Sequence, residues 1–274
     1  MKKFFFLAVV AMALLTVSCS DDDDNNGIIR QYGEKPVKEL IFTQGNEVVH
    51  FVNIYDIWGR LVSCTINEWH MKLVADYSKI PPAFHCYTLD DEGQVVLDDE
   101  GKAKEGLPMK AVFSNGKISS LSILDVDDEG QEYEEMRINY TYDANGKPIE
   151  LKYTDFNTEG EETWSTTIFY TWSEGNLVSY SYSGDDYYYK VEYSDKPNKS
   201  GVIPFVIMNG MDAFSILGDF YFKNLPTKVI EVKANGDEEV QRTYDWELNS
   251  AGLPTCLYWH QIDPDRTFTV EFRY

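Results

Sequence analysis

The feature that most constrains the fold is a strand–turn–strand unit that recurs along the chain. Each copy has an aromatic residue alternating with polar neighbours, then a polar turn containing glycine, then a second alternating run that begins near a Leu or Ile. Alternation with a period of two on both sides of a glycine turn is the pattern of a β-hairpin. The copies are Asn53–Ile66, Asn139–Tyr153, Phe169–Tyr182 and Arg242–Trp259. Since the turns are closely spaced, we expect consecutive strands to pair as an antiparallel meander.

Further glycine turns lie between these units. They are found at Asn115-Gly116, Asn235-Gly236, Asp90–Gly93 and Asp98–Gly101. Asn-Gly pairs supply the two residues with positive φ that a type I′ turn needs. We also predict a positive φ for Gly146 and for Gly236, where an added side chain would be costly.

Two stretches depart from the hairpin pattern. Asn67–Pro82 favours a helix, because its large apolar side chains recur at helical spacing, with Asn67 as a cap and Pro81 beyond the end. Gly201–Phe220 is apolar without alternation and predicts a flap over the sheet. We therefore expect a single all-β domain over residues 30–274. It is a curved antiparallel meander or barrel-like sheet with one or two short helices, and the sequence does not choose between a closed barrel and an open sheet.

The first 18 residues predict a lipoprotein signal peptide. Lys2 and Lys3 precede the apolar run Phe4–Leu15, which is shorter than the roughly 20 residues that a membrane-spanning helix needs. Small residues then lead to Cys19. A lipoprotein signal peptidase would cut before this cysteine, and its thiol would then be acylated. An ordinary secretory signal with a chance cysteine is the alternative. Several acyl chains would hold the protein at the membrane far more firmly than one.

An acidic run follows the cysteine directly. It consists of Ser20, Asp21, Asp22, Asp23 and Asp24. Because these carboxylates repel one another and stay hydrated, residues 19–29 are expected to form a tether between membrane and domain. The run resembles the export signal of surface-exposed lipoproteins in Bacteroidetes-type bacteria. That resemblance implies a lipid-anchored protein of the outer membrane, displayed at the cell surface.

Charge and cysteine content exclude some partners and leave others open. The formal net charge is −22, and removal of the signal peptide takes away two lysines and no acid. So acidic a chain is repelled by nucleic acid, which is bound through Lys and Arg. After Cys19 the chain has Cys64, Cys86 and Cys256. These allow one disulfide with one free thiol, or three buried free thiols. No cofactor or zinc site is expected, and no protein partner is specified.

The hairpins also carry a family resemblance. The pattern Y-x-Y-D-x-x-G at Tyr140–Gly146 resembles the YD-type repeats of bacterial surface proteins. Together with "GDFYFKNLPTKV" and "YDWELNSAGLPTCLYW" in the C-terminal half, it resembles a Bacteroidetes family of lipoproteins of unknown function. The resemblance covers roughly residues 30–274 and implies a porin-like, barrel-type β fold. It brings no catalytic residues with it.

Acidic residues give two weak chemical hypotheses. Asp125–Met136 resembles a calcium-binding loop, but Met136 stands where the bidentate glutamate is required. We therefore interpret this stretch as a solvated turn and predict no metal. A pair of carboxylates could hydrolyse glycosides, although so many acids make chance pairs common. No nucleophile-elbow, zinc-protease or phosphate-loop motif is present in the sequence.

The aromatic stretch Trp164–Tyr193 is the most suggestive for function. Flat rings in a row on a sheet can stack on sugars, and the candidate ligand-binding residues are Trp172, Tyr180, Tyr182 and Tyr188. The alternative is a ladder of aromatic rings across neighbouring strands, which stabilises the sheet by about 0.2–1 kcal/mol per pair. Because one face of the sheet must be core, the rings on that face are structural in either case. Tyr180 should pair near Tyr170, and Tyr188 should lie on the opposite face from Tyr182.

The C-terminal strand alternates apolar residues and ends on Tyr274, as the last strand of an outer-membrane barrel does. A lipid anchor and the polar stretch Glu231–Gln241 argue instead for a closing strand outside the membrane. We thus expect a surface lipoprotein that binds glycan or another nutrient without catalysis. An envelope hydrolase with a carboxylate pair, and a structural surface protein without a small ligand, are the alternatives.

Overall fold

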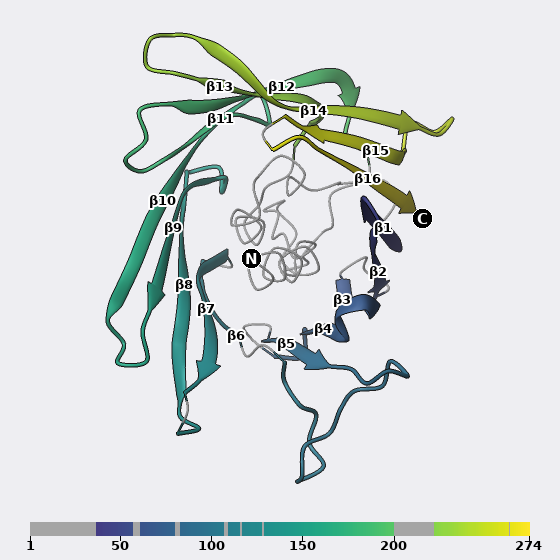
Figure 1. The fold of residues 1–274 in the computed structure, drawn as a ribbon, viewed down its shortest axis with the longest axis vertical. Helices are drawn as coiled ribbons and strands as arrows, with labels where there is room; N and C mark the ends of the chain where they lie inside the picture. The colour runs from purple at the N-terminus through teal and green to yellow at the C-terminus, as the bar shows by residue number, and fades with distance from the viewer. Residues whose placement is uncertain are drawn as a thin grey trace.

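The computed structural model describes residues 37–56, 61–79, 83–106, 109–115, 117–127, 129–199, 222–262 and 264–274. Within them, sixteen antiparallel strands form a single sheet (Figure 1). In the first half the strands are β1 Glu39–Gln44, β2 Glu47–Tyr55, β3 Leu61–Ile66, β4 Met71–Asp76, β5 Ala83–Thr88, β6 Met109–Ser114, β7 Lys117–Val126 and β8 Glu132–Tyr142. In the second half they are β9 Pro148–Phe156, β10 Glu162–Ser173, β11 Asn176–Tyr182, β12 Tyr188–Pro197, β13 Asn224–Val232, β14 Glu238–Leu248, β15 Pro254–Gln261 and β16 Arg266–Arg273.

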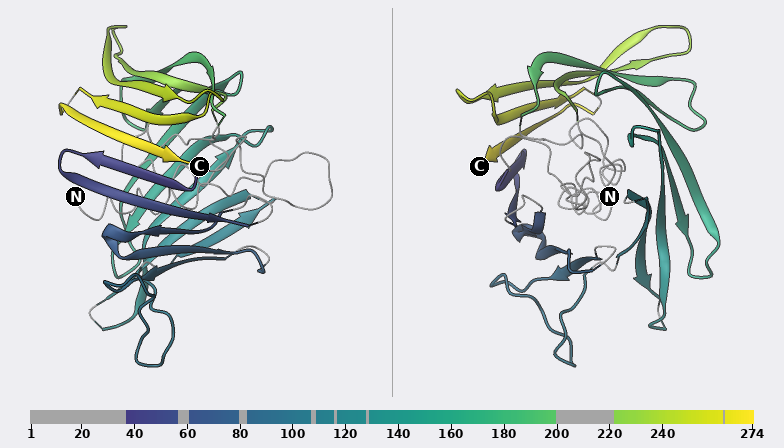
Figure 2. Two further views of the ribbon diagram at one scale, coloured as in Figure 1. Left: turned by 90° about the vertical axis from the view of Figure 1, so that its right-hand side faces the viewer. Right: turned by 180° about the vertical axis from the view of Figure 1, so that it is seen from behind.

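The sheet bends into a nearly closed ring. Each strand pairs with its neighbours in sequence, and β1 pairs with β16 over six residue positions from Glu39↔Arg273 to Gln44↔Phe268. The two ends of the strand order are β5 and β6, so the opening lies between them (Figures 1 and 2). The all-β, barrel-like prediction is therefore confirmed. Short hairpin connections explain why neighbours in sequence are neighbours in space.

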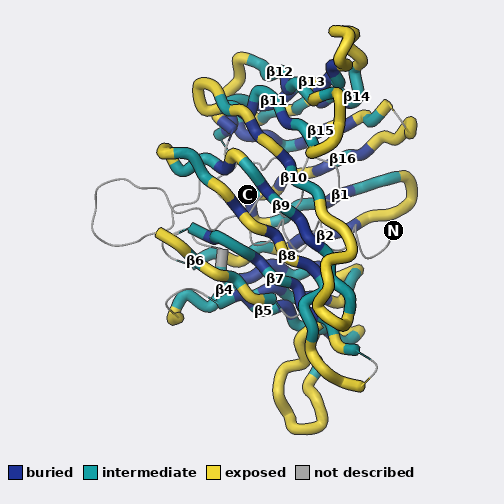
Figure 3. The backbone as a smooth tube through the Cα atoms, turned by 90° about the vertical axis from the view of Figure 1, so that its left-hand side faces the viewer, coloured by how far each residue is buried: buried dark blue, intermediate teal, exposed yellow. Residues whose placement is uncertain are grey.

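The core lies on the concave face of the ring. Along β8, the buried residues Met136, Ile138 and Tyr140 alternate with exposed ones, and the same alternation is visible on neighbouring strands in Figure 3. Buried side chains from strands all around the ring form one cluster, which only the concave face can collect. The most deeply buried include Ile66, Leu73, Leu121, Ile123, Ile138, Leu151, Ile168 and Leu177. Each such side chain stabilises the fold by about 1.5–3 kcal/mol.

Most turns share one side-chain arrangement. Asp143 accepts backbone N–H bonds from Asn145 at 2.9 Å and Lys147 at 2.8 Å through a single carboxylate oxygen, and the Gly146 N–H bonds the Asp143 carbonyl at 3.0 Å. The same pair of side-chain bonds is made by Asp90, Asp98, Asp127, Asn157 and Asn249. Asp127 therefore uses its carboxylate to hold a turn within the stretch that resembles a calcium loop.

The predicted glycine conformations are confirmed, with one correction of turn type. Gly146 and Gly236 have φ values of 78° and 87°. Asn235, however, has no positive φ, and the Gly236 N–H bonds the Lys233 carbonyl at 2.8 Å. The glycine thus follows a type I-like turn instead of completing a type I′ turn. The type I′ geometry occurs at Glu174-Gly175, where both residues have positive φ.

The prediction of a helix over Asn67–Pro82 is wrong. Among residues 67–79, the described part of this stretch, the helical structure is limited to a 3₁₀ turn, Asn67–Trp69, and the chain then enters β4. Met71 and Leu73 alternate inward on β4 and pair with both β3 and β5, so strand pairing prevails over the helical spacing of the apolar residues. In the described part of the chain, no helix is long and apolar enough to cross a membrane. The expected flap lies outside the described residues.

The three cysteines of the domain are buried free thiols. Cys64 and Cys86 lie on β3 and β5, each opposite Leu73 on the strand between them. Two strand spacings of about 4.8 Å each place their Cα atoms too far apart for a disulfide. Burial raises the pKa of the Cys64 thiol far above its usual value. The alternative with three free thiols is the one that the structure contains.

Candidate functional site

The aromatic residues of β10, β11 and β12 line up across the concave face. Tyr170 lies opposite Tyr180, as the sequence predicted, and Tyr180 lies opposite Tyr189 on the next strand. Tyr182 lies opposite Ile168, whose side chain is fully buried. Strand alternation therefore puts Tyr180, Tyr182 and Tyr189 on the same inward-facing surface.

Four of these rings form what we call the tyrosine cluster: Tyr180, Tyr182, Tyr187 and Tyr189. Tyr180 stacks on Tyr189 with ring centroids 4.8 Å apart. Tyr182 and Tyr187 each meet Tyr189 edge to face, at 6.3 Å and 5.5 Å. Tyr180 is only 2% exposed, whereas the other three rings are partly exposed. The cluster thus has a buried base and an accessible outer part.

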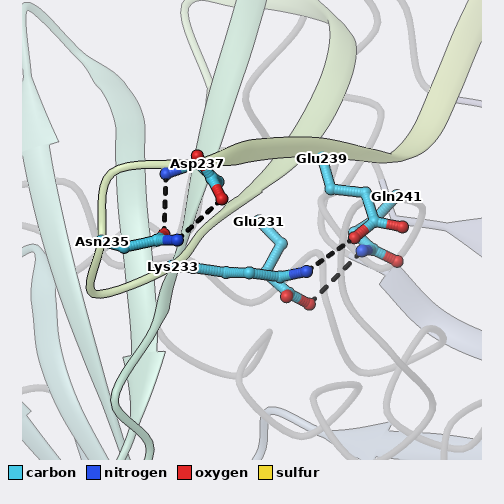
Figure 4. A network of polar contacts seen from close by, with 6 residues as sticks. All are labelled: Glu231, Lys233, Asn235, Asp237, Glu239 and Gln241. Carbon is cyan, nitrogen blue, oxygen red and sulfur yellow. Dashed lines mark hydrogen bonds and ion pairs between the residues drawn. The ribbon is translucent and has the colours of Figure 1, made fainter.

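Charged groups adjoin the cluster. Burial raises the pKa of Tyr189, as does the negative charge of Glu231, while a hydrogen bond from Tyr187 and the positive charge of Arg242 oppose the increase. Arg242 is 3% exposed, so its guanidinium is held in the core of the ring. Gln241 donates to the Glu231 carboxylate at 3.3 Å (Figure 4).

The same close-up shows how the hairpin that carries Glu231 is held. Lys233, just past the end of β13, donates to Glu239 on β14 at 2.9 Å, and Asn235 donates to Asp237 in the turn (Figure 4). These contacts fix the hairpin backbone beside the tyrosines. Aromatic faces combined with a carboxylate and an amide are the groups that can stack on a sugar ring and bond its hydroxyls.

The structure separates the four predicted ligand-binding residues. Tyr182 belongs to the accessible part of the tyrosine cluster. Tyr180 lies in the core, because closure of the ring covers its side chain, so its ring is not at the surface. Tyr188 is 44% exposed and points to the convex face, opposite to Tyr182 and Tyr189 as expected from alternation. Trp172 lies at the far end of β10, where it is opposite Leu177.

Trp172 has an evident structural role. Its indole N–H donates to the Pro148 carbonyl at 2.7 Å, its ring lies 5.9 Å from the Phe222 ring, and the Lys147 ammonium lies 5.0 Å from its centroid. A β-bulge between Thr171 and Trp172 also shifts it out of register with the tyrosine cluster. The sequence could not show this bulge.

Trp172 is one of a series of rim aromatics, and the hydrogen bond that they share is what sequence reasoning missed. In each, an aromatic residue in the second half of an even-numbered strand, or just beyond it, donates to a carbonyl near the start of the preceding strand. The pairs are Tyr55–Val37, Tyr142–Ile118, Trp172–Pro148, Tyr193–Leu177, Trp246–Pro226 and Tyr274–Pro254, at 2.7–2.8 Å. Even-numbered strands run in one direction, so these aromatics share one end of the ring. The recurring Pro followed 20 or 24 residues later by Trp or Tyr is the signal that could have revealed them.

A second pair of site residues was also missed. Trp164 on β10 lies directly opposite Asp155 on β9, and no bulge intervenes between this pair and Ile168↔Leu151. Both side chains therefore face the concave side, at the end of the ring remote from the rim aromatics. Trp164 is 41% exposed. Its position at the start of the aromatic stretch was visible in the sequence, but its partner across the strands was not.

Comparison with known proteins shows that similar folds occur in solved structures. No family model and no curated protein matches the sequence. A porin-like protein from Bacteroides uniformis ATCC 8492 is similar in structure, with a TM-score of 0.52, 15% identity and coverage of 89% of this chain and 99% of that one. A porin-like protein from Bacteroides vulgatus ATCC 8482 is also similar, with a TM-score of 0.57 and 12% identity, and the match covers 88% of this chain and 99% of that one. This chain has the fold of these porin-like proteins.

At these identities the similarity to the porin-like proteins concerns the fold alone. It confirms the barrel-like architecture that the family resemblance implied. Membership of a lipoprotein family with YD repeats stays a prediction, and the lipidation and export residues, Cys19 and Ser20–Asp24, lie outside the described residues.

Proposed function

We propose that this chain is a lipid-anchored surface protein whose concave face binds glycan without catalysis. The observation that carries the proposal is the tyrosine cluster, in which three rings stay partly exposed beside Glu231 on the concave face. A fully packed aromatic ladder would stabilise the sheet better with these rings covered. Accessible rings that flank hydrogen-bonding groups suit a ligand with apolar faces and hydroxyl edges, which describes a sugar.

Attachment through lipid is supported by the polarity of the two faces. A barrel that spans a membrane carries an apolar band on its outside, about 25 Å tall. In this ring the core residues face inward, and β16 directs Phe268, Val270 and Phe272 into the core. Apolar residues also occur on the outside, but Phe169, for example, lies between the polar residues Glu150 and Ser181 of the neighbouring strands. The outside carries ion pairs such as Lys190 with Glu238, at 3.4 Å. A lipid on Cys19 would then hold the protein at the membrane, with residues 19–29 as the tether.

A glycan array probed with the unlipidated mature chain, residues 20–274, tests the binding proposal. We expect retention of at least one class of glycan, and loss of that signal when Tyr182 and Tyr189 are both replaced by Ala. The convex-face variant Tyr188→Ala is the matched control and should bind as the wild type does. A folded protein that binds no glycan on the array would refute the proposal and favour a purely structural surface role.

A hydrolase is the second candidate, and one observation favours it. Burial raises the pKa of Asp155, and the negative charge of Glu135 raises it further. A carboxyl group with a raised pKa close to a second carboxyl group is the arrangement by which glycosidases divide acid and base roles. To test for hydrolysis, the glycans that bind on the array are incubated with the wild type and with Asp155→Asn. Release of reducing sugar by the wild type alone would establish hydrolysis.

A further inference from the structure

We infer that the ligand site extends from the tyrosine cluster along β10 to Trp164 and Asp155, and that its ligand is an extended, uncharged oligosaccharide. This inference rests on the proposed glycan binding and adds the size and charge of the ligand. It depends on the placement of one exposed tryptophan and one buried carboxylate oxygen on the same inward-facing surface.

The first step is that both positions belong to the concave face. Pairing runs without a shift from Trp164↔Asp155 to Ile168↔Leu151. Ile168 and Leu151 are fully buried in the core. Because residues two and four apart share a strand face, Trp164 and Asp155 lie on the same surface as these core residues.

The second step concerns Trp164. The large apolar side chains of the core cluster are buried, and those packed against it are at least partly buried, yet Trp164 keeps 41% of its surface exposed. An indole ring presented at the open end of a concave surface offers a flat apolar face. Trp is also the aromatic that contributes most at binding sites when a partner covers it.

The third step concerns Asp155. One oxygen of its carboxyl group is buried and accepts no hydrogen bond from the described residues. A buried acceptor without a donor destabilises the free protein, and a ligand hydroxyl that donates to it would remove this cost. A sugar stacked on Trp164 would carry such hydroxyls at its ring edge, directly across the strand pair from the indole.

The fourth step gives the ligand its length. Tyr182 lies opposite Ile168, four residues along β10 from Trp164. At about 3.3 Å per residue, the two aromatic positions are roughly 13 Å apart along the strand. Thr166 occupies the same face between them. One sugar unit cannot reach both positions, so only a chain of sugars would contact both.

The fifth step gives the ligand its charge. Glu135 adjoins Met136, which lies opposite Asp155 on the neighbouring strand, so a second acidic group stands near Asp155 at this end of the site. A carboxylate on the ligand would be repelled by about 1 kcal/mol at 4 Å even in water, and by more where water is excluded. Sugars bearing uronic acids are therefore disfavoured, and neutral ones are accepted.

Isothermal titration of the full mature chain tests this extension. The probes are neutral gluco-, xylo-, manno- and galacto-oligosaccharides from disaccharide upward, with an oligogalacturonate of matched length. We expect affinity to rise with length in one neutral series, and the oligogalacturonate to bind at least about fivefold more weakly than the galacto-oligosaccharide. Trp164→Ala should weaken the long members about tenfold and leave the disaccharide unchanged. Asp155→Asn should reduce the discrimination against the uronic acid.

Phe169→Ala is the matched control, because Phe169 lies on β10 with 45% of its surface exposed but faces the convex side. It should bind every probe as the wild type does, and thermal unfolding of all variants checks that they fold. Affinity independent of length, or Trp164→Ala binding like wild type while the Tyr182 and Tyr189 variant does not bind, would refute the extension alone. Failure of the wild type to bind any probe or array glycan would refute glycan binding itself.

Discussion

The ring of Phe84 on β5 stacks on the ring of Phe113 on β6, with centroids 6.4 Å apart and planes inclined by 23°, although no strand ladder joins these two strands. Side chains therefore bridge the opening that backbone hydrogen bonds leave. Phe84 is buried in the core, and Phe113 packs against it. This apolar contact adds to backbone bonds between β5 and the segment before β6, where the Gly106 N–H donates to the Cys86 carbonyl at 2.7 Å.

Removing this bridge should destabilise the domain. We expect Phe84→Ala to lower the free energy of unfolding by about 3 kcal/mol, because it leaves a cavity in the core. A double-mutant cycle with Phe113→Ala should show a coupling of about 0.5–1.5 kcal/mol, measured by urea unfolding. Val112→Ala, at a position 55% exposed, is the control and should change stability by less than about 0.5 kcal/mol. Additive losses would show that the two rings do not support each other.

Trp172 and Tyr182 should respond differently to truncation. Trp172→Ala removes a packed ring and leaves the Pro148 carbonyl without its donor, so we expect a fall of several degrees in melting temperature and no specific loss of glycan binding. Tyr182→Ala should reduce binding to an array glycan more than it reduces stability. Thermal unfolding and titration on the same samples provide the comparison. If both variants lose several degrees and bind equally well, the tyrosine cluster is only part of the core.

Gly146 occupies a backbone conformation that side chains disfavour. Its φ is 78°, and an added Cβ would also meet the Lys117 side chain at 2.7 Å. We expect Gly146→Val to lower the free energy of unfolding by roughly 1–2 kcal/mol. Gly236→Val shares the positive φ but meets nothing within 4 Å, so it separates backbone strain from crowding. An unchanged unfolding midpoint for Gly146→Val would contradict the assigned turn.

The free energy of unfolding of the domain should decrease at alkaline pH. Burial raises the pKa of Cys64, Tyr140 and Tyr244 in the folded state. Groups with a raised folded pKa stabilise fully below their unfolded pKa values, which are about 8.5 for a thiol and about 10 for a phenol. That contribution is lost as pH rises from those values toward the folded ones. Urea midpoints should therefore fall between about pH 8.5 and pH 11, and Cys64→Ala should remove the earliest part of the decline.

The proposed lipid anchor and the proposed export signal can be tested separately. Cys19→Ala should release the protein from the membrane fraction, because the acylation site is gone. Replacement of Asp21–Asp24 by Ala should keep the protein membrane-bound but protect it from protease added to whole cells. Fractionation and protease shaving measure the two outcomes. Unchanged protease sensitivity in the second variant would refute the export signal while leaving the anchor intact.

Local chemistry in the sequence determined the hairpins of this protein. Alternation fixes which residues share a strand face, and glycine at a position of positive φ fixes where the chain turns, so the units around Gly146 and Gly236 could be located without coordinates. The pairing of Tyr170 with Tyr180 followed from the same local count. Both depend only on residues close in sequence, where the backbone geometry has a fixed period.

Tertiary structure decided which face is inside and where the ring closes. Tyr180 and Tyr188 look alike in the sequence, yet curvature buries the first and exposes the second. Pairing of β1 with β16 and the contact of Trp164 with Asp155 across their strands depend on register, which bulges such as the one at Trp172 can shift by a residue. Since one such shift reverses the face of every following side chain, register is set by the packing of the whole core and not by any single segment.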